Sequence, residues 1–320
     1  MKQPILARGG PRSRGVIDTI SAGYGIVNRQ PWLLIAPILL DALLWLGPQM
    51  SLAVLAGEVL NAPLPVQEMD ETSRRGLEDL RAMAEGSNVL VLLQSPLRMG
   101  IPSALAVMGG GGLAGQFMLP NWGVAGLLML GSLAVGLLLG GFYRAALAQQ
   151  VLHQATGFSS LTREALAGAW RIGRLLLLAL VVLVLAALLA AVLIALLSLV
   201  SPLLGGVVLV LVVGLALLAD IYIFFAPDAI YVRRVGARQS IRDSVTLVRA
   251  NPWAALRFIV LVSVILAGMS QVWLLLAERG PAGMLLAVLG NAYIASGLAA
   301  ASMVYYQERA ASLDTPSAPA

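Results

Sequence analysis

The feature that most constrains this chain is residues 175–200, a run dominated by Leu, Val, Ala and Ile with no charged side chain. A helix needs roughly 20 mostly apolar residues to cross about 30 Å of hydrocarbon, and this run is long enough to do so. The short stretch SPLLGG then leads into a second apolar run, 203–226. Together the two runs predict a tight hairpin of membrane-spanning helices.

The composition indicates a membrane fold rather than a soluble one. Hydrophobic residues make up 59% of the 320 residues, only 12% are charged, and the mean hydropathy is +0.87. Soluble domains are about half apolar and about a quarter charged. We therefore expect an all-α fold, a polytopic membrane helix bundle with no separate soluble domain. Six stretches qualify as spans: 32–57, 122–148, 172–200, 203–226, 254–277 and 281–306.

The first of these stretches is the weakest, because Pro37, Asp41 and Pro48 interrupt it. Proline is tolerated in spanning helices where neighbouring groups re-satisfy the freed carbonyls. The expected organisation is a cytoplasmic N-terminal segment with an interfacial helix (1–31), a six-helix transmembrane domain (32–306) that includes a structured external loop (58–120), and a disordered cytoplasmic tail (307–320).

The basic residues predict the orientation. Six spans place both termini on one side, and 16 of the 21 Lys and Arg residues fall in the two terminal segments and in the connections 143–175 and 227–257. Because Lys and Arg are enriched in cytoplasmic loops, we expect both termini in the cytoplasm. Topology thus explains the basic charge, and no nucleic-acid partner is expected. The chain has no cysteine, which excludes disulfides and thiolate metal sites.

Two segments of the chain resemble each other. When 15–32 is laid over 236–253, the shared order is a small residue, aliphatic residues and then Pro-Trp. A weaker third copy, 161–178, lacks the Pro-Trp pair. Any cytoplasmic approach to a span can have this composition, but the matched order favours an internal repeat. The paired residues include Thr19 with Ser240, Val27 with Val248, Pro31 with Pro252 and Trp32 with Trp253.

Each copy also has the pattern of an amphipathic interfacial helix. Ile17, Ile20, Tyr24 and Val27 recur at helical spacing in the first copy. Such a helix lies in the interface with its apolar face toward the lipid and its Arg residues toward the phosphates, and Trp favours the headgroup region. We expect membrane lipids as partners, with headgroup contacts from Arg29, Trp32, Arg238, Arg242, Arg249 and Trp253.

The second copy carries a family resemblance. The stretch FFAPDAIYVRRVG, followed by ARQSIRDSVTLVRANPWAALRFIVLVSVIL, resembles a loose group of bacterial six-span proteins that includes the membrane domain associated with glycerophosphoryl diester phosphodiesterases. The resemblance covers about 226–265 and implies a six-span fold in a bacterial inner membrane. Members with known catalysis carry it in an attached soluble domain, which is not expected here. The matching residues are Pro227, Arg233, Arg234, Ser240 or Ser244, Arg249 and Asn251.

The external loop 58–120 is long enough to have its own structure or function. Its stretch 68–86 predicts a capped helix, with Asp70 or Thr72 as the N-cap and Gly86 after its end. The apolar stretch 88–108 is split by prolines and predicts two short helices that lie on the membrane or plug the bundle. The Gly run 109–112 then acts as a joint. We expect this loop to meet an external protein partner.

Ionisable groups within spans are candidates for function, because they are costly in hydrocarbon. Asp41 lies roughly 14 Å beyond Trp32 along a helix, near the midplane. Asp41 and Asp220 could line a polar pathway for a cation or proton, or could fix helix packing through a neighbouring helix or Arg257. Gln271 and Asn291 are expected mainly as interhelical hydrogen-bond partners. Asp228 is expected to be solvated or paired with Arg233.

The sequence offers little for catalysis. The sole histidine, His153, has no nearby carboxylate cluster, and no metal, nucleophile-elbow or phosphate-loop motif is present. We therefore predict a non-enzyme without cofactor or metal. Its expected role is a binding, assembly or accessory component of the membrane, and the alternative is a small permease or channel with Asp41 in a polar pathway.

Overall fold

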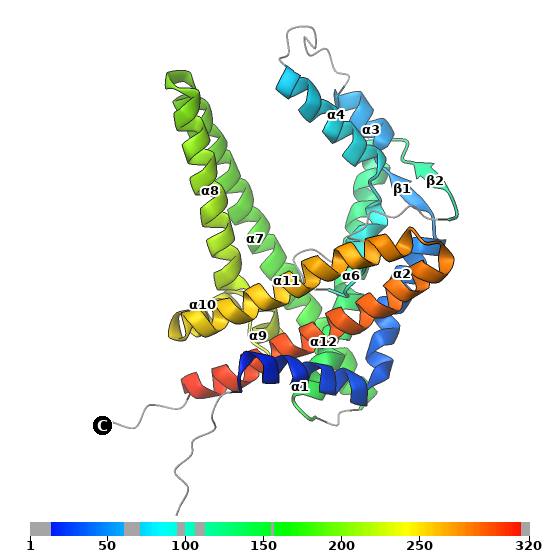
Figure 1. Cartoon of the computed structure of the whole chain (residues 1–320), viewed down its shortest axis with the longest axis vertical. Helices are drawn as coiled ribbons and strands as arrows, with labels where there is room; N and C mark the ends of the chain where they lie inside the picture. The colour runs from blue at the N-terminus through cyan, green and yellow to red at the C-terminus, as the bar shows by residue number, and fades with distance from the viewer. Residues whose placement is uncertain (1–13, 61–70, 95–99, 106–112, 155–156, 315–320) are drawn as a thin grey trace, which may run out of the picture.

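The computed structural model describes residues 14–60, 71–94, 100–105, 113–154 and 157–314. Helices dominate these residues, which confirms the predicted all-α fold (Figure 1). Five helical stretches are long and apolar enough to cross a membrane, which is the architecture of a multi-pass membrane protein. These stretches contain α6 (Trp122–Val151), α7 (Phe158–Val200), α8 (Pro202–Ile223) with α9 (Ala226–Val232), α11 (Pro252–Ala277) and α12 (Pro281–Asp314).

The first predicted span is not one helix. A 3-10 turn, η1 (Pro31–Leu34), leads into α2 (Ile35–Leu46), and the chain is extended at Gly47 (ψ 179°). The helix ends there because Gly47 precedes Pro48, and a residue before proline is disfavoured in the helical conformation. Strand β1 (Gln49–Ser51) and α3 (Ala53–Leu60) follow. A sixth span exists only if α1 (Val16–Arg29) and 31–46, which meet at 94°, count as one broken span.

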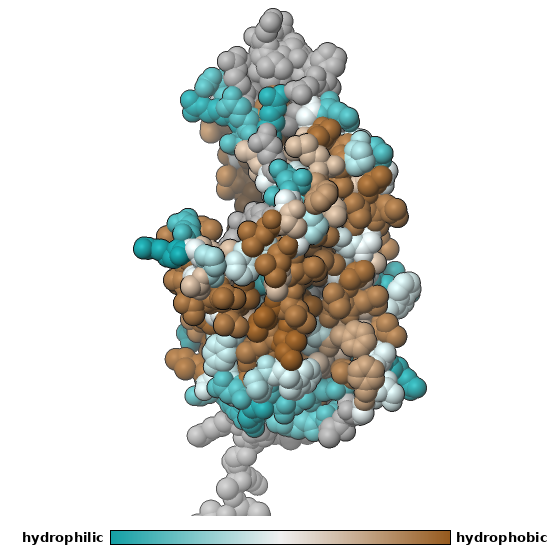
Figure 2. All heavy atoms as spheres, turned by 90° about the vertical axis from the view of Figure 1, so that its right-hand side faces the viewer, coloured by the Kyte–Doolittle hydropathy of each residue, from teal (hydrophilic) through white to brown (hydrophobic). Residues whose placement is uncertain are grey.

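Two long hairpins set the shape of the molecule. Figure 1 shows the α7–α8 hairpin standing apart from the α11–α12 hairpin, so that α8 and α11 diverge. Helix α8 packs along α7 and, near its end, on α10 (Ala237–Ala250). Most Leu and Val side chains of the α7–α8 hairpin are exposed, as expected for a surface that faces lipid. Figure 2 shows a broad hydrophobic band between more hydrophilic ends on another face.

Helices α1 and α10 follow the same local path. Each has 14 residues, starts after an extended glycine, and ends at a residue with ψ of 66° or 67° that precedes a proline. Their buried residues occupy equivalent positions, 221 apart. Helix α1 packs on α12, and α10 packs on α9 and α8. The buried residues are Thr19, Gly23, Ile26 and Val27 in α1, and Ser240, Ser244, Leu247 and Val248 in α10.

This packing changes the expected role of the amphipathic face. Val27 faces protein rather than lipid, and Ile17 is 76% exposed. Helix α1 approaches α12 closely because Gly23 has no side chain: a Cβ there would lie 2.5 Å from the carbonyl oxygen of Gly297. Interhelical contact therefore uses the small residues, while Ile17 stays on the outer surface.

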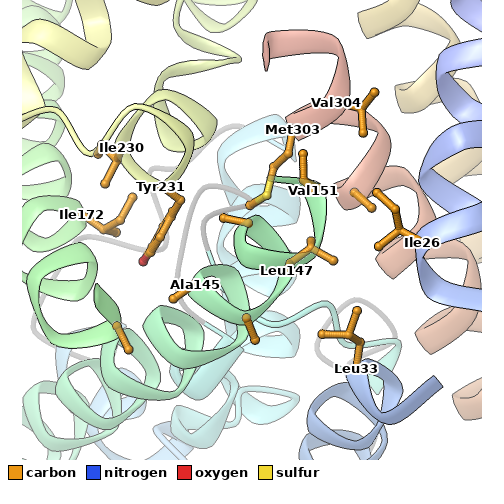
Figure 3. Packing of buried hydrophobic residues seen from close by; sticks show 14 of the residues in the cluster. Ile26, Leu33, Ala145, Leu147, Val151, Ile172, Ile230, Tyr231, Met303 and Val304 are labelled. Atoms are coloured by element: carbon orange, nitrogen blue, oxygen red, sulfur yellow. The ribbon is translucent and has the colours of Figure 1, made fainter. Parts of the chain in front are cut away.

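The main core lies where α6, α7, α9 and α12 meet (Figure 3). Leu147 and Val151 of α6 pack there with Ile172 of α7, Ile230 of α9 and Met303 of α12. Burial of such side chains contributes roughly 1.5–3 kcal/mol each where the alternative is water. The core fixes α6, α9 and α12 relative to one another.

The predicted loop helix is present as α4 (Glu71–Glu85), with Gly86 after its end. Asp70 and the run 109–112 lie outside the described residues. Strand β2 (Gln116–Met118) pairs in parallel with β1, which ties the end of the loop to the end of α2. The two-stranded sheet therefore joins the end of the loop to the segment between α2 and α3.

Part of the loop enters the bundle. We call 89–94, which is the 3-10 helix η3 (Val89–Gln94), together with 100–105 the inserted segment. Its residues Ile101 and Leu105 are buried. Gly136 of α6 accommodates the segment, because a Cβ there would lie 2.6 Å from the carbonyl oxygen of Leu92. The sequence predicts that 88–108 either lies on the membrane or plugs the bundle. The described part of this stretch plugs the bundle.

The predicted disordered tail is wrong for 307–314, because α12 continues to Asp314. The guanidinium of Arg309 stacks 3.5 Å from the centre of the Tyr305 ring. Glu308 also forms an ion pair with Arg14 at 3.4 Å. This pair brings the start of α1 and the end of α12 to the same end of the molecule.

Candidate functional site

The candidate site is built around a break between α8 and α9. Proline has no N–H, so Pro227 cannot donate the bond that a continuous helix would direct to the carbonyl of Ile223. The hydroxyl of Ser244 in α10 bridges the break, because it contacts one backbone group on each side of it. It donates to the carbonyl oxygen of Tyr222 at 2.7 Å and accepts from the N–H of Phe225 at 3.2 Å. The repaired break positions Asp228 in the first turn of α9.

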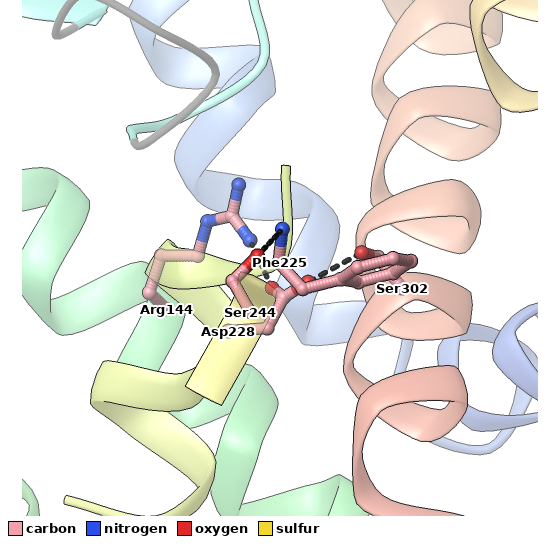
Figure 4. Close-up of polar contacts among 5 residues, drawn as sticks. All are labelled: Arg144, Phe225, Asp228, Ser244 and Ser302. Carbon is pink, nitrogen blue, oxygen red and sulfur yellow. Dashed lines mark hydrogen bonds and ion pairs between the residues drawn. The ribbon is translucent and has the colours of Figure 1, made fainter. Parts of the chain in front are cut away.

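Asp228 forms a buried ion pair with Arg144 of α6 (Figure 4). The Nη1 of Arg144 lies 3.2 Å from Oδ1 of Asp228, and the two residues are 7% and 2% exposed. The hydroxyl of Ser302 in α12 donates to the other carboxylate oxygen. The pair therefore joins three helices through charge-assisted hydrogen bonds, which are about twice as strong as neutral ones.

The expectation that Asp228 is solvated or paired with Arg233 is wrong. Arg233 instead pairs with Asp243 at 3.3 Å on the surface. Asp228 turns inward because α9 packs its buried face on the core that α6 and α12 form.

A cavity of about 400 Å³ lies beside this ion pair, between α8, α11, α12 and the inserted segment. Its apolar lining includes Ile223, Val262 and Leu266. Its polar lining residues are Gln94, Ser103, Arg144, Asp220, Asp228, Ser263, Ser270, Asn291 and Ser302.

Two of the predicted polar residues, Asp220 and Asn291, come together in this cavity. Within the described part of the chain, Asp220 has no hydrogen-bond or ion-pair partner. The Nδ2 of Asn291 is buried and finds no acceptor among the described residues. Buried polar groups are nearly always hydrogen-bonded, so the buried amide nitrogen of Asn291 is available to a ligand. Asp220 is exposed on α8, and its carboxylate is likewise open to a ligand in the cavity.

Asp41 has a different role. It is fully buried in α2, where the hydroxyl of Ser103 and the backbone N–H groups of Ala104 and Leu105 donate to its carboxylate, the latter two at 3.1 and 3.3 Å. These bonds attach the inserted segment to α2. Asp41 thus fixes packing, and through Ser103 it holds one wall of the cavity.

The remaining predicted residues lie elsewhere. Gln271 is exposed on α11 and does not line the cavity, and Arg257 is also exposed. The six predicted headgroup residues, Arg29, Trp32, Arg238, Arg242, Arg249 and Trp253, are all exposed, as headgroup contact requires.

The charges of the site favour a positively charged ligand. Arg144 contributes one positive charge and Asp220 and Asp228 contribute two negative charges, so the lining has a formal charge of −1. The described residues contain no group of His, Cys, Asp and Glu suited to a metal ion. The arrangement can bind a cationic group against Asp220 and surround it with apolar walls. Comparison with models of protein families, with curated proteins and with solved structures finds no match to this chain.

Sequence reasoning missed Arg144 and Ser302 and misplaced Asp228. The apolar run predicts that Arg144 lies in the connection after the second span. In the structure, α6 continues to Val151, so Arg144 lies inside the helix. The available signal was the apolar context of both charges, GGFYRAALA and FFAPDAIY. A charge surrounded by apolar residues in a span needs a partner of opposite charge.

Proposed function

We propose that this chain is a non-enzymatic membrane protein that binds a small organic cation in the cavity between α8, α11 and α12. The observation that carries the proposal is Asp220, a carboxylate that has no partner in the described chain and lines an apolar-walled cavity. Its role would be that of a binding or accessory component of the membrane.

A carboxylate without a partner raises the free energy of a membrane-spanning helix. An ionisable residue within a span is expensive unless it meets water, an opposite charge or a ligand. Arg144 cannot serve Asp220 fully, because its Nη1 is bonded to Asp228. A ligand with an ammonium or similar group would supply the missing positive charge, and the Asn291 side chain could donate to a polar atom of the same ligand.

A binding measurement tests this proposal. The full chain, purified in a neutral detergent, is dialysed to equilibrium against tetraphenylphosphonium, a permanently charged apolar cation. We expect saturable binding that Asp220→Asn weakens about tenfold, which corresponds to about 1.4 kcal/mol. Glu278→Gln is the matched control, because it removes one negative charge from an exposed position outside the cavity. Equal affinity for wild type and Asp220→Asn would contradict the proposal.

A permease is the second candidate, and the polar side chains that α8, α11 and α12 contribute to the cavity favour it. Uptake of the same cation into proteoliposomes separates the two functions. A permease loses uptake in Asp220→Asn, whereas a binding component shows no uptake above that of empty vesicles. The sequence predicts Asp41 in the pathway of a permease, but the three donors that Asp41 receives from the inserted segment favour a structural role.

The cellular setting belongs to the same proposal. We place the chain in a bacterial inner membrane with both termini in the cytoplasm, because the basic residues concentrate at that end. There α1 and α10 would meet anionic headgroups through the six exposed Arg and Trp residues.

The equivalent buried positions of α1 and α10 support an internal duplication. The resemblance to the phosphodiesterase-associated membrane domain is a further proposal, supported by Pro227 and Ser244.

The external loop is proposed to contact a protein partner. Figure 1 shows α3 and α4 projecting from the bundle at the end opposite α1. Deleting 68–86 removes α4 and leaves the inserted segment in place. We expect this deletion to remove specific co-purifying proteins in mild detergent, and an unchanged set would contradict the assignment.

A further inference from the structure

A second cavity, of about 430 Å³, lies at the basic end of the molecule. It is formed by the first turns of α7, by α9 and by Arg234, which follows α9. Its charged lining residues are Arg163, Arg171, Arg234 and Glu164, which gives a formal charge of +2. It therefore attracts anions, whereas the first cavity attracts cations.

Two arginines of this cavity have guanidinium groups that are open to a ligand. In the part of the chain that the structure describes, Arg163 and Arg171 have no ion-pair or hydrogen-bond partner, and neither does the Tyr231 hydroxyl. Arg234 is engaged, because its Nη2 bonds Glu164 and lies 2.8 Å from Oε1 of Gln154. Arg234 thus neutralises the only acid in the lining, and the two free guanidinium groups remain for a ligand.

The cavity is also held in shape. A side chain at Gly168 would collide with the ring of Tyr231, so the glycine lets this ring form the floor. Arg234 has a left-handed backbone (φ 56°), which is uncommon for a residue other than glycine. Its two side-chain bonds to Glu164 and Gln154 stabilise that conformation. Gly168, Tyr231 and Arg234 thus define one side of the cavity.

We propose that this cavity binds a phosphate ester. Planar guanidinium groups bind phosphate oxygens with two parallel hydrogen bonds, which makes Arg the preferred residue for such groups. A cavity of about 430 Å³ exceeds the size of a single phosphate, so it accommodates the esterified group as well.

The position of the cavity defines two sources of the ester. The charge-free run of α7 starts at Leu175, directly after Arg174, so Arg171 lies near the boundary of the apolar region. A phospholipid headgroup reaches this level from the membrane, and a soluble phosphate ester reaches it from water. Both carry the same phosphate chemistry.

Ligand-induced changes in Tm and titration calorimetry on the purified full chain test the proposal. The probes are dioctanoyl phosphatidic acid, glycerol 3-phosphate, inorganic phosphate and the uncharged dioctanoylglycerol. We expect saturable binding of at least one phosphate ester and none of dioctanoylglycerol. Arg171→Gln should weaken ester binding at least tenfold, since a hydrogen bond to a charged group contributes more than a neutral one. Arg171→Lys should lose less.

The matched control is Arg174→Gln, one turn later on α7. Arg174 stacks on Trp170 and does not line the cavity. We expect its affinity to stay within twofold of wild type, with a normal helical circular dichroism spectrum for each variant. Tighter binding of phosphatidic acid than of glycerol 3-phosphate identifies a lipid headgroup as the source, and equal binding identifies a soluble ester. Absence of saturable ester binding, or equal losses in Arg171→Gln and Arg174→Gln, overturns the proposal.

Discussion

At the scale of single residues, the buried pair Arg144–Asp228 is the strongest constraint in the described bundle. Asp228→Asn leaves a buried guanidinium without its counter-charge, which costs about 3–5 kcal/mol in buried pairs. We expect a corresponding loss of stability toward unfolding by dodecyl sulfate. Replacing both partners, as Arg144→Met with Asp228→Leu, should recover most of that loss. A double variant as unstable as the single one would contradict this account.

Ser244 offers a second test at this scale. Ser244→Ala removes the donor to Tyr222 and the acceptor of Phe225 N–H at the α8–α9 break. Each buried group left unpaired costs about 1–3 kcal/mol. We expect faster amide exchange across 222–228. Ser240→Ala is the control, because its hydroxyl bonds only within α10, to the carbonyl oxygen of Ala237, and 222–228 should exchange as in wild type.

At the scale of elements, the inserted segment depends on glycines of α6. Gly136→Leu would drive a side chain into the backbone of η3, and overpacking of this kind costs about 1–3 kcal/mol. We expect lower stability and loss of amide protection over 89–94 and 100–105. Gly131→Leu is the control, because a Cβ there meets nothing within 4 Å. Similar effects of the two substitutions would refute the close contact.

The element scale also shows what the sequence could predict. The long helices follow from apolar runs, because length and hydropathy alone decide whether a segment can cross a bilayer. The helix at 71–85 follows from its polar pattern and the glycine after it. The inserted segment could be predicted only as one of two alternatives, since its position depends on Gly136 and on the bonds to Asp41, both set by tertiary contacts.

The candidate site was predictable only in part for the same reason. Asp220 and Asn291 were found because each is polar within an apolar span. The pairing of Arg144 with Asp228 joins residues 84 positions apart. It depends on how α6 and α9 pack, and on α6 extending past the point where its apolar run ends. No periodicity along the chain contains that information.

At the scale of the whole molecule, the orientation is directly testable because the chain has no cysteine. Glu78→Cys places a thiol at an exposed position of α4, and Arg238→Cys places one at an exposed position of α10. In intact spheroplasts we expect a membrane-impermeant maleimide to label Glu78→Cys alone. After the membrane is permeabilised, Arg238→Cys should react as well. The opposite order of labelling would reverse the proposed topology.

The cavity beside Asp220 is proposed to bind an organic cation. Photolabelling of the full chain with a diazirine-bearing quaternary ammonium compound, followed by peptide mapping, tests it most directly. We predict labels on α11 and α12 around Leu266, Ser270 and Asn291 that an excess of tetraphenylphosphonium prevents and that Asp220→Asn strongly reduces. Labels spread along the α7–α8 hairpin, insensitive to both the competitor and the substitution, would contradict the claim.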